Sequence, residues 1–209
     1  MSKTGAGKCA VGIKRERLKV LNVGGNSKAI AIPDCFDGWR HDLLDIDPRG
    51  KPDVLCDARE LWKLPPRQYD AIYCSHNLEH YHKHDVRNVL KGFRMILKKE
   101  GYALIRVPDI RAVMQRVVDE VLDIDDILYQ SPSGPILVND VIYGWHVEIE
   151  RSGNDFFAHK TGFTRQSLER VLKDNGFPFV FSKSENLEVT AFAFMQQPGD
   201  EPLKQLGLI

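Results

Sequence analysis

Residues 19–26, KVLNVGGN, decide how this chain folds, because a short apolar run ends abruptly in the glycine pair Gly24 and Gly25. Three more apolar runs follow at short intervals, and each ends at or next to a small or acidic residue: residues 43–47 (LLDID), 54–58 (VLCDA) and 70–74 (DAIYC). Such runs are typical of strands buried on both faces of a parallel sheet. The carboxyl ends of parallel strands meet at one edge, where ligands bind.

Helices are expected between and after these strands. Apolar residues recur every three or four positions from Val86 to Leu97, which predicts a helix with one face packed on the sheet. A second helix is expected from Arg165 to Asn175, because Thr164 can cap its start and Gly176 can end it. Residues 179–181 and 189–195 supply two final strands. The pattern predicts an α/β fold.

Composition and length suit a single globular domain. The chain has 209 residues, 43% of them hydrophobic, and its 29 Lys and Arg balance 29 Asp and Glu. This balance gives no reason to expect a nucleic-acid or membrane partner. The four cysteines lack disulfide or metal spacing, and no apolar run approaches the roughly 20 residues that span a bilayer. We therefore expect a cytoplasmic protein.

The chain divides into three regions. Residues 1–16 are predicted to be a flexible tail, residues 17–197 a single domain, and residues 198–209 a C-terminal tail. Within the domain, residues 110–160 resemble an insertion interrupted by a breaker at residues 131–135 (SPSGP). Because this segment follows the fifth strand at the carboxyl edge, we expect it to act as a lid over the ligand.

The motif Ser75-His76-Asn77-Leu78-Glu79-His80 directly follows the fourth strand. Three other features accompany it: the glycine turn, a helix that ends in residues 98–101 (KKEG), and a later segment at residues 159–164 (HKTGFT). Together they resemble class I S-adenosylmethionine-dependent methyltransferases of the type 11-like family. The resemblance covers roughly residues 18–195. It implies a doubly wound, Rossmann-like seven-stranded sheet, mostly parallel with an antiparallel last strand, and helices on both faces.

The resemblance also implies S-adenosylmethionine as cofactor, with S-adenosylhomocysteine as product. The family's cofactor contacts come from the glycine turn, the ends of the second and third strands, and the motif after the fourth. In this sequence they correspond to Val23, Gly24, Gly25, Asn26, Asp45, Ile46, Asp57, Ala58, Ser75, His76 and Leu78.

Carboxylates at two strand ends are the central part of this predicted site. Asp45 is expected to accept hydrogen bonds from both ribose hydroxyls, with Asp47 as the alternative. Asp57 is expected to accept from the adenine amino group, or to cap the following helix, and one side chain can do both. The family usually has an acid where Asn22 stands, and an amide cannot neutralise the cofactor's ammonium group.

Four histidines, His76, His80, His82 and His84, lie within nine positions. A metal site is one interpretation, but this short stretch would need a further donor from elsewhere in the chain. The resembled family is not metal-dependent, so we expect no metal. His80 and His159 are the predicted catalytic residues, since a base near neutral pH can take a proton from a hydroxyl acceptor. His146 is a further candidate.

The predicted function is methyl transfer to a small-molecule acceptor, at oxygen or nitrogen. A non-catalytic S-adenosylmethionine-binding module is the alternative, and Asn22 is its best support. An NAD-dependent oxidoreductase is a third class, but it would need a Gly-x-Gly-x-x-Gly turn that opens a helix. The stretch from Gly24 lacks glycine at the third and sixth positions of that pattern.

Overall fold

The computed structural model describes residues 17–132 and 134–209. Its centre is a seven-stranded sheet in the order β3-β2-β1-β4-β5-β9-β8. The strands are β1 (Lys19–Val23), β2 (Arg40–Asp45), β3 (Val54–Leu55), β4 (Tyr69–Ser75), β5 (Leu97–Pro108), β8 (Phe179–Glu185) and β9 (Glu188–Phe194). The predicted flexible tail at residues 1–16 lies outside the described residues.

The strand pairing confirms the predicted doubly wound sheet with an antiparallel last strand. Strand β1 pairs in parallel with β2 and β4, β2 pairs in parallel with β3, and β4 pairs in parallel with β5. The last strand, β9, is antiparallel to both neighbours, β5 and β8. Because β1 has β2 on one side and β4 on the other, the loops after all three open at the same edge of the sheet.

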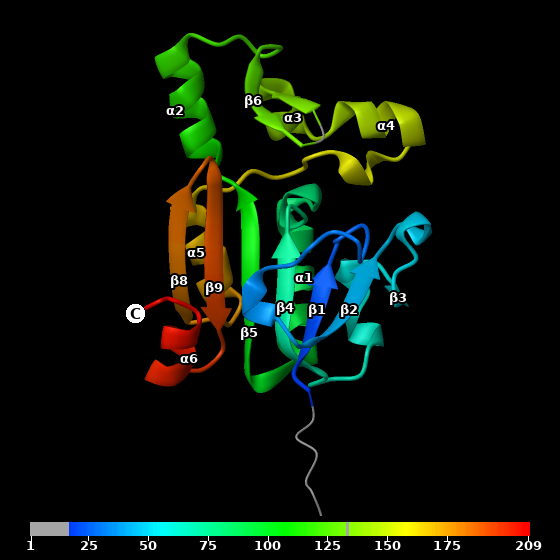
Figure 1. The fold of residues 1–209 in the computed structure, drawn as a ribbon, viewed down its shortest axis with the longest axis vertical. Helices are drawn as coiled ribbons and strands as arrows, with labels where there is room; N and C mark the ends of the chain where they lie inside the picture. Colours follow the sequence, from blue (N-terminus) through cyan, green and yellow to red (C-terminus); the bar gives the residue numbers. More distant parts are fainter. Residues whose placement is uncertain (1–16, 133) are drawn as a thin grey trace, which may run out of the picture.

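One face of the sheet carries the larger core. It is covered by α1 (Lys83–Ile96), α5 (Arg165–Asp174) and the 3-10 turn η3 (Ala58–Lys63). Figure 1 shows α1 and α5 behind the sheet. The apolar stripe of α1 is buried as its spacing predicts, with Val89, Leu90 and Phe93 fully inaccessible to solvent. The predicted cap of α5 is also present, since Thr164 Oγ1 accepts from Ser167 N at 3.2 Å.

The other face is covered more thinly. Between β1 and β2 the chain forms no α-helix and runs to the short turn η1 (Asp34–Phe36). Phe36 packs with Tyr73, Tyr102 and Phe194 in an aromatic cluster. The predicted C-terminal tail instead contains the helix α6 (Asp200–Gln205), which buries Leu203 in this cluster.

The predicted insertion forms a separate layer above the carboxyl edge of the sheet (Figure 1). It contains α2 (Ile110–Glu120), the antiparallel pair β6 (Ile127–Ser131) and β7 (Gly134–Leu137), α3 (Val138–Tyr143), α4 (His146–Ser152) and η5 (Asp155–Phe157). The layer has its own small core, made by Val113, Leu128, Val138 and Val141. The predicted breaker falls where β6 meets β7, with Ser131 paired to Gly134, and its residue 133 lies outside the described residues.

Within residues 17–132 and 134–209, no helix is long and apolar enough to span a membrane.

The burial of Leu203 predicts that α6 contributes to stability. Leu203→Ala removes a buried side chain from the aromatic cluster and should lower the free energy of unfolding by about 2 kcal/mol. Lys204→Ala changes an exposed neighbour on the same helix and should change it by less than about 0.5 kcal/mol. Urea unfolding of both variants measures the difference. Equal, small effects would show that the helix adds nothing to the fold.

Candidate functional site

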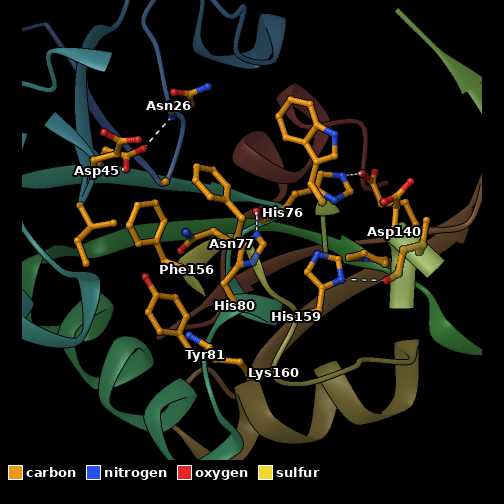
Figure 2. Close-up of a pocket in the computed structure, with 18 of the residues that line it drawn as sticks. Asn26, Asp45, His76, Asn77, His80, Tyr81, Asp140, Phe156, His159 and Lys160 are labelled. Atoms are coloured by element: carbon orange, nitrogen blue, oxygen red, sulfur yellow. Dashed lines mark hydrogen bonds and ion pairs between the residues drawn. The ribbon is translucent and has the colours of Figure 1, made fainter. Parts of the chain in front are cut away.

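A cavity of about 490 Å³ lies between the carboxyl edge of the sheet and the insertion layer. Its walls come from the loops after β1, β2, β3 and β4, and from β6, α3, η5 and the chain that follows η5. Figure 2 shows Asn26 and Asp45 at one side of the cavity, His159 and Asp140 at the other, and Asn77 and His80 between them. The volume suits a small-molecule ligand.

The glycine turn sets the floor of this cavity. Gly24 has a φ of +72°, and a Cβ added there would lie 2.1 Å from Nδ2 of Asn77. A Cβ on Gly25 would lie 2.1 Å from Nδ2 of Asn22, which is itself buried. Neither position has room for a side chain. Gly24 allows the loops after β1 and β4 to touch, and Gly25 allows the turn to fold back on Asn22 of β1.

Asp45 ends β2 with its carboxylate turned into the cavity wall. Oδ2 accepts from the backbone N–H of Asn26 at 2.9 Å, and Oδ1 accepts from that of Asp47 at 2.9 Å. Each carboxylate oxygen can accept further hydrogen bonds. The predicted acid therefore joins the glycine turn to the end of β2 and keeps acceptor capacity toward the cavity.

The other two acids are already paired with arginines. Asp47 accepts from Arg49 Nε at 2.7 Å and caps η2 (Pro48–Gly50) by accepting from Arg49 N at 2.9 Å. The hydrogen bond from Arg49 lowers the pKa of Asp47. Asp57 caps η3 through Arg59 N at 2.8 Å and binds the Arg59 guanidinium through both oxygens. Burial raises the pKa of Asp57, but the bonds from Arg59 outweigh it and lower that pKa.

His76 follows β4 in a left-handed conformation, with a φ of 47°, and lies between two carboxylates. Its Nε2 is 2.8 Å from Oε2 of Glu188, and its Nδ1 is 3.5 Å from Oε1 of Glu79. Burial lowers the pKa of His76, but the two carboxylates outweigh it and raise that pKa to about 9. Glu188 also pairs with Arg106, whose Nε donates at 2.7 Å.

The two predicted catalytic histidines come together although 79 positions separate them (159 minus 80). The ring centroids of His80 and His159 are 4.9 Å apart. Nδ1 of His159 is 2.9 Å from the carbonyl oxygen of Val141, so it carries the proton and leaves Nε2 with a lone pair. Burial lowers the pKa of His159, which favours the neutral ring. His146 does not line the cavity.

The insertion layer supplies an apolar wall opposite the sheet. Tyr129, Trp145, Phe156 and Phe157 line the cavity, whereas Tyr143 does not and is 57% exposed. The layer is tied to the sheet by Arg49, whose Nη2 lies 2.9 Å from Oε1 of the buried Glu148 in α4.

The structure brings most of the predicted site residues to the cavity. Those that line it are Gly24, Asn26, Asp45, Ile46, Asp57, His76, His80 and His159. Those that do not are Val23, Gly25, Ala58, Ser75 and Leu78. The side chains of Val23, Ala58 and Leu78 are buried in the larger core.

Sequence reasoning missed several residues that line the cavity: Asn77, Tyr81, Asp140 and Lys160. Asn77 and Tyr81 lie in or beside the motif after β4, so their position was a usable signal. Asp140 and Lys160 belong to the insertion and its exit, where no periodic pattern indicated which side chains turn inward.

Comparisons with known proteins agree with this geometry. A family model described as "Methyltransferase domain" matches residues 4–180. A SAM-dependent methyltransferase structure from Archaeoglobus fulgidus is similar with a TM-score of 0.52 at 16% identity, over 85% of this chain and 86% of that one.

Two further solved structures are similar to this chain. A 1,6-didemethyltoxoflavin-N1-methyltransferase from Burkholderia thailandensis has a TM-score of 0.50 at 15% identity, over 85% of this chain and 70% of that one. A possible histamine N-methyltransferase from Thermotoga maritima has a TM-score of 0.52 at 14% identity, over 85% of this chain and 82% of that one. No curated protein matches the sequence. At these identities the structural matches show the fold alone.

The contact between Gly25 and Asn22 predicts that adding one methyl group at residue 25 destabilises the fold. Gly25→Ala places a Cβ against a buried amide that cannot turn into solvent, and should lower the free energy of unfolding by about 1–3 kcal/mol. Gly199→Ala is the matched control, because the nearest atom to its Cβ is 3.9 Å away. Chemical denaturation measures both variants. Equal stabilities would mean that the turn is looser than this packing implies.

Proposed function

Because the chain belongs to the family of methyltransferase domains, we propose that it transfers a methyl group from S-adenosylmethionine to a small-molecule acceptor, at oxygen or nitrogen. The observation that supports this most directly is the cavity at the carboxyl edge, where the glycine turn and Asp45 meet. The cofactor supplies an electrophilic methyl group on a sulfonium. The protein's residues bind, orient and enclose it.

The residues at the sheet edge fit this cofactor. The turn at Gly24 and Gly25 allows the backbone to approach a ligand closely. Each Asp45 oxygen accepts one backbone hydrogen bond and can accept another from a ribose diol. Both carboxylate oxygens of Asp57 already accept hydrogen bonds from Arg59. An adenine amino group bound there would donate to a carboxylate that also caps η3.

The insertion layer and the two histidines would act on the methyl acceptor in different ways. The aromatic side chains of the insertion and the ion pair between Arg49 and Glu148 would hold this layer over the site and exclude water. A hydroxyl acceptor must lose its proton, and His80 and His159 line the cavity where that proton can leave. This supports their predicted catalytic role.

The alternative of a non-catalytic binding module rested on Asn22. Its side chain packs against Gly25 and does not line the cavity, so its lack of charge bears less on cofactor binding than the sequence alone indicated. Transfer of labelled methyl groups to any member of an acceptor panel would decide between the two functions.

Calorimetry tests the cofactor assignment. S-adenosylmethionine and S-adenosylhomocysteine should both bind at one site per chain, and NAD should show no comparable binding, because the turn after β1 does not open the helix that a dinucleotide site uses. Tighter binding of NAD would overturn the assignment.

A pair of neighbouring substitutions tests the ribose contact. Asp45→Ala should weaken S-adenosylhomocysteine binding by on the order of 2 kcal/mol, the loss of hydrogen bonds to a charged group. Asp47→Ala should weaken it less, because Asp47 is already engaged by Arg49. Thermal unfolding of both variants controls for loss of fold. A larger effect at Asp47 would show that the ribose is held there.

A further inference from the structure

One buried carboxylate at the site has a charged neighbour but no hydrogen bond. Glu79 is 1% exposed, and among the described residues neither of its carboxylate oxygens has a hydrogen-bond partner. The nearest cation, Nδ1 of His76, is 3.5 Å away, which is too long for a good hydrogen bond. A buried carboxylate without hydrogen bonds is costly, so this group calls for a ligand or another explanation.

The two cavity histidines lie beside this carboxylate. One donor atom from each of Glu79, His80 and His159 lies within 4.8 Å of the other two. In the part of the chain that the structure describes, Nε2 of His159 makes no hydrogen bond, and its Nδ1 is held by the Val141 carbonyl. A backbone carbonyl on the second ring nitrogen is the usual support of a histidine that binds a metal.

Both ring nitrogens of His80 lie against carbonyl oxygens. Its Nδ1 lies 3.1 Å from the carbonyl oxygen of Ala158, and its Nε2 lies 3.1 Å from that of His76. A neutral imidazole has one N–H, so one of its lone pairs must face a carbonyl oxygen. A second proton on His80 would let both ring nitrogens donate to these carbonyls, but the Glu79 oxygens would still have no hydrogen bond.

We propose that Glu79, His80 and His159 bind a first-row divalent transition metal. A single ion would satisfy the Glu79 carboxylate, the His159 Nε2 lone pair and the spare lone pair of His80 together. Two nitrogens and one carboxylate oxygen form a donor set that suits Zn²⁺ and Fe²⁺. His159 is the further donor that the short histidine stretch lacked, and it reverses our expectation of no metal.

Metal binding requires the three side chains to approach one another, and His80 to turn its lone pair away from the carbonyl oxygen that it faces. Ligands about 2.1 Å from a tetrahedral Zn²⁺ lie roughly 3.4 Å from one another, so the three side chains would close by at most about 1.4 Å. With a metal bound, the two histidines would no longer act as bases, and three protein ligands leave one position for water or an acceptor oxygen. That last consequence rests on the proposed function, whereas the metal site does not.

Metal titration of the tag-free full chain tests the proposal. After dialysis against EDTA, the protein should bind one Zn²⁺ per chain by calorimetry, and Co²⁺ should give visible absorption bands of a four- or five-coordinate site. Glu79→Gln and His159→Gln should each weaken Zn²⁺ binding by about tenfold or more and remove the Co²⁺ bands. His84→Gln is the matched control, because this exposed histidine of the same stretch lies outside the cluster.

Thermal unfolding separates a metal ligand from a structural residue. Zn²⁺ should raise the Tm of the wild type and of His84→Gln, and leave the Tm of Glu79→Gln and His159→Gln unchanged. Either of the two cluster variants suffices if the other does not fold. The proposal is overturned if the wild type binds less than one ion per chain, or if the cluster variants bind Zn²⁺ as tightly as His84→Gln does.

Calorimetry with S-adenosylhomocysteine on the same samples keeps the two claims apart. Cofactor binding without stoichiometric metal would refute the metal site and leave the proposed function intact. Stoichiometric metal that depends on Glu79 and His159, without cofactor binding, would refute the proposed function and leave the metal site intact.

Discussion

The contact between the loops after β1 and β4 is the constraint on which the rest of the site depends. Gly24 approaches Asn77 so closely that no side chain fits between them, and Gly25 lies directly against the buried Asn22. Asp45 ties the same turn to β2 through the amide of Asn26. Three parallel strands are thereby joined at one edge, where their loops form the floor of the cavity.

The strands that this contact joins were largely predicted from the sequence. Apolar runs that end in Gly24, Asp45 and Asp57 predict buried parallel strands, because a strand covered on both faces needs continuous apolar residues. The glycine pair predicted the turn after the first strand, whereas its contact with Asn77 was not predicted. The helix spacing of Val89, Leu90 and Phe93 was equally direct, since each turned out fully buried.

Other features could not be predicted from the sequence, because they depend on contacts between distant residues. The region after Gln197 is too short to form a core of its own, and only the aromatic cluster formed by distant strands gives Leu203 a surface to pack against. The meeting of His80 with His159 depends on how the insertion returns to the sheet, where Lys160 N donates to the Glu79 carbonyl at 2.8 Å. Local periodicity carries no information about such long-range contacts.

A crystal structure with S-adenosylhomocysteine tests the central claim most directly. The account predicts the ligand in the cavity, with its ribose hydroxyls on Asp45 and its sulfur facing the side lined by His80 and His159. A ligand bound elsewhere, or a ribose held by a residue other than Asp45 with the sulfur turned away from these histidines, would contradict it.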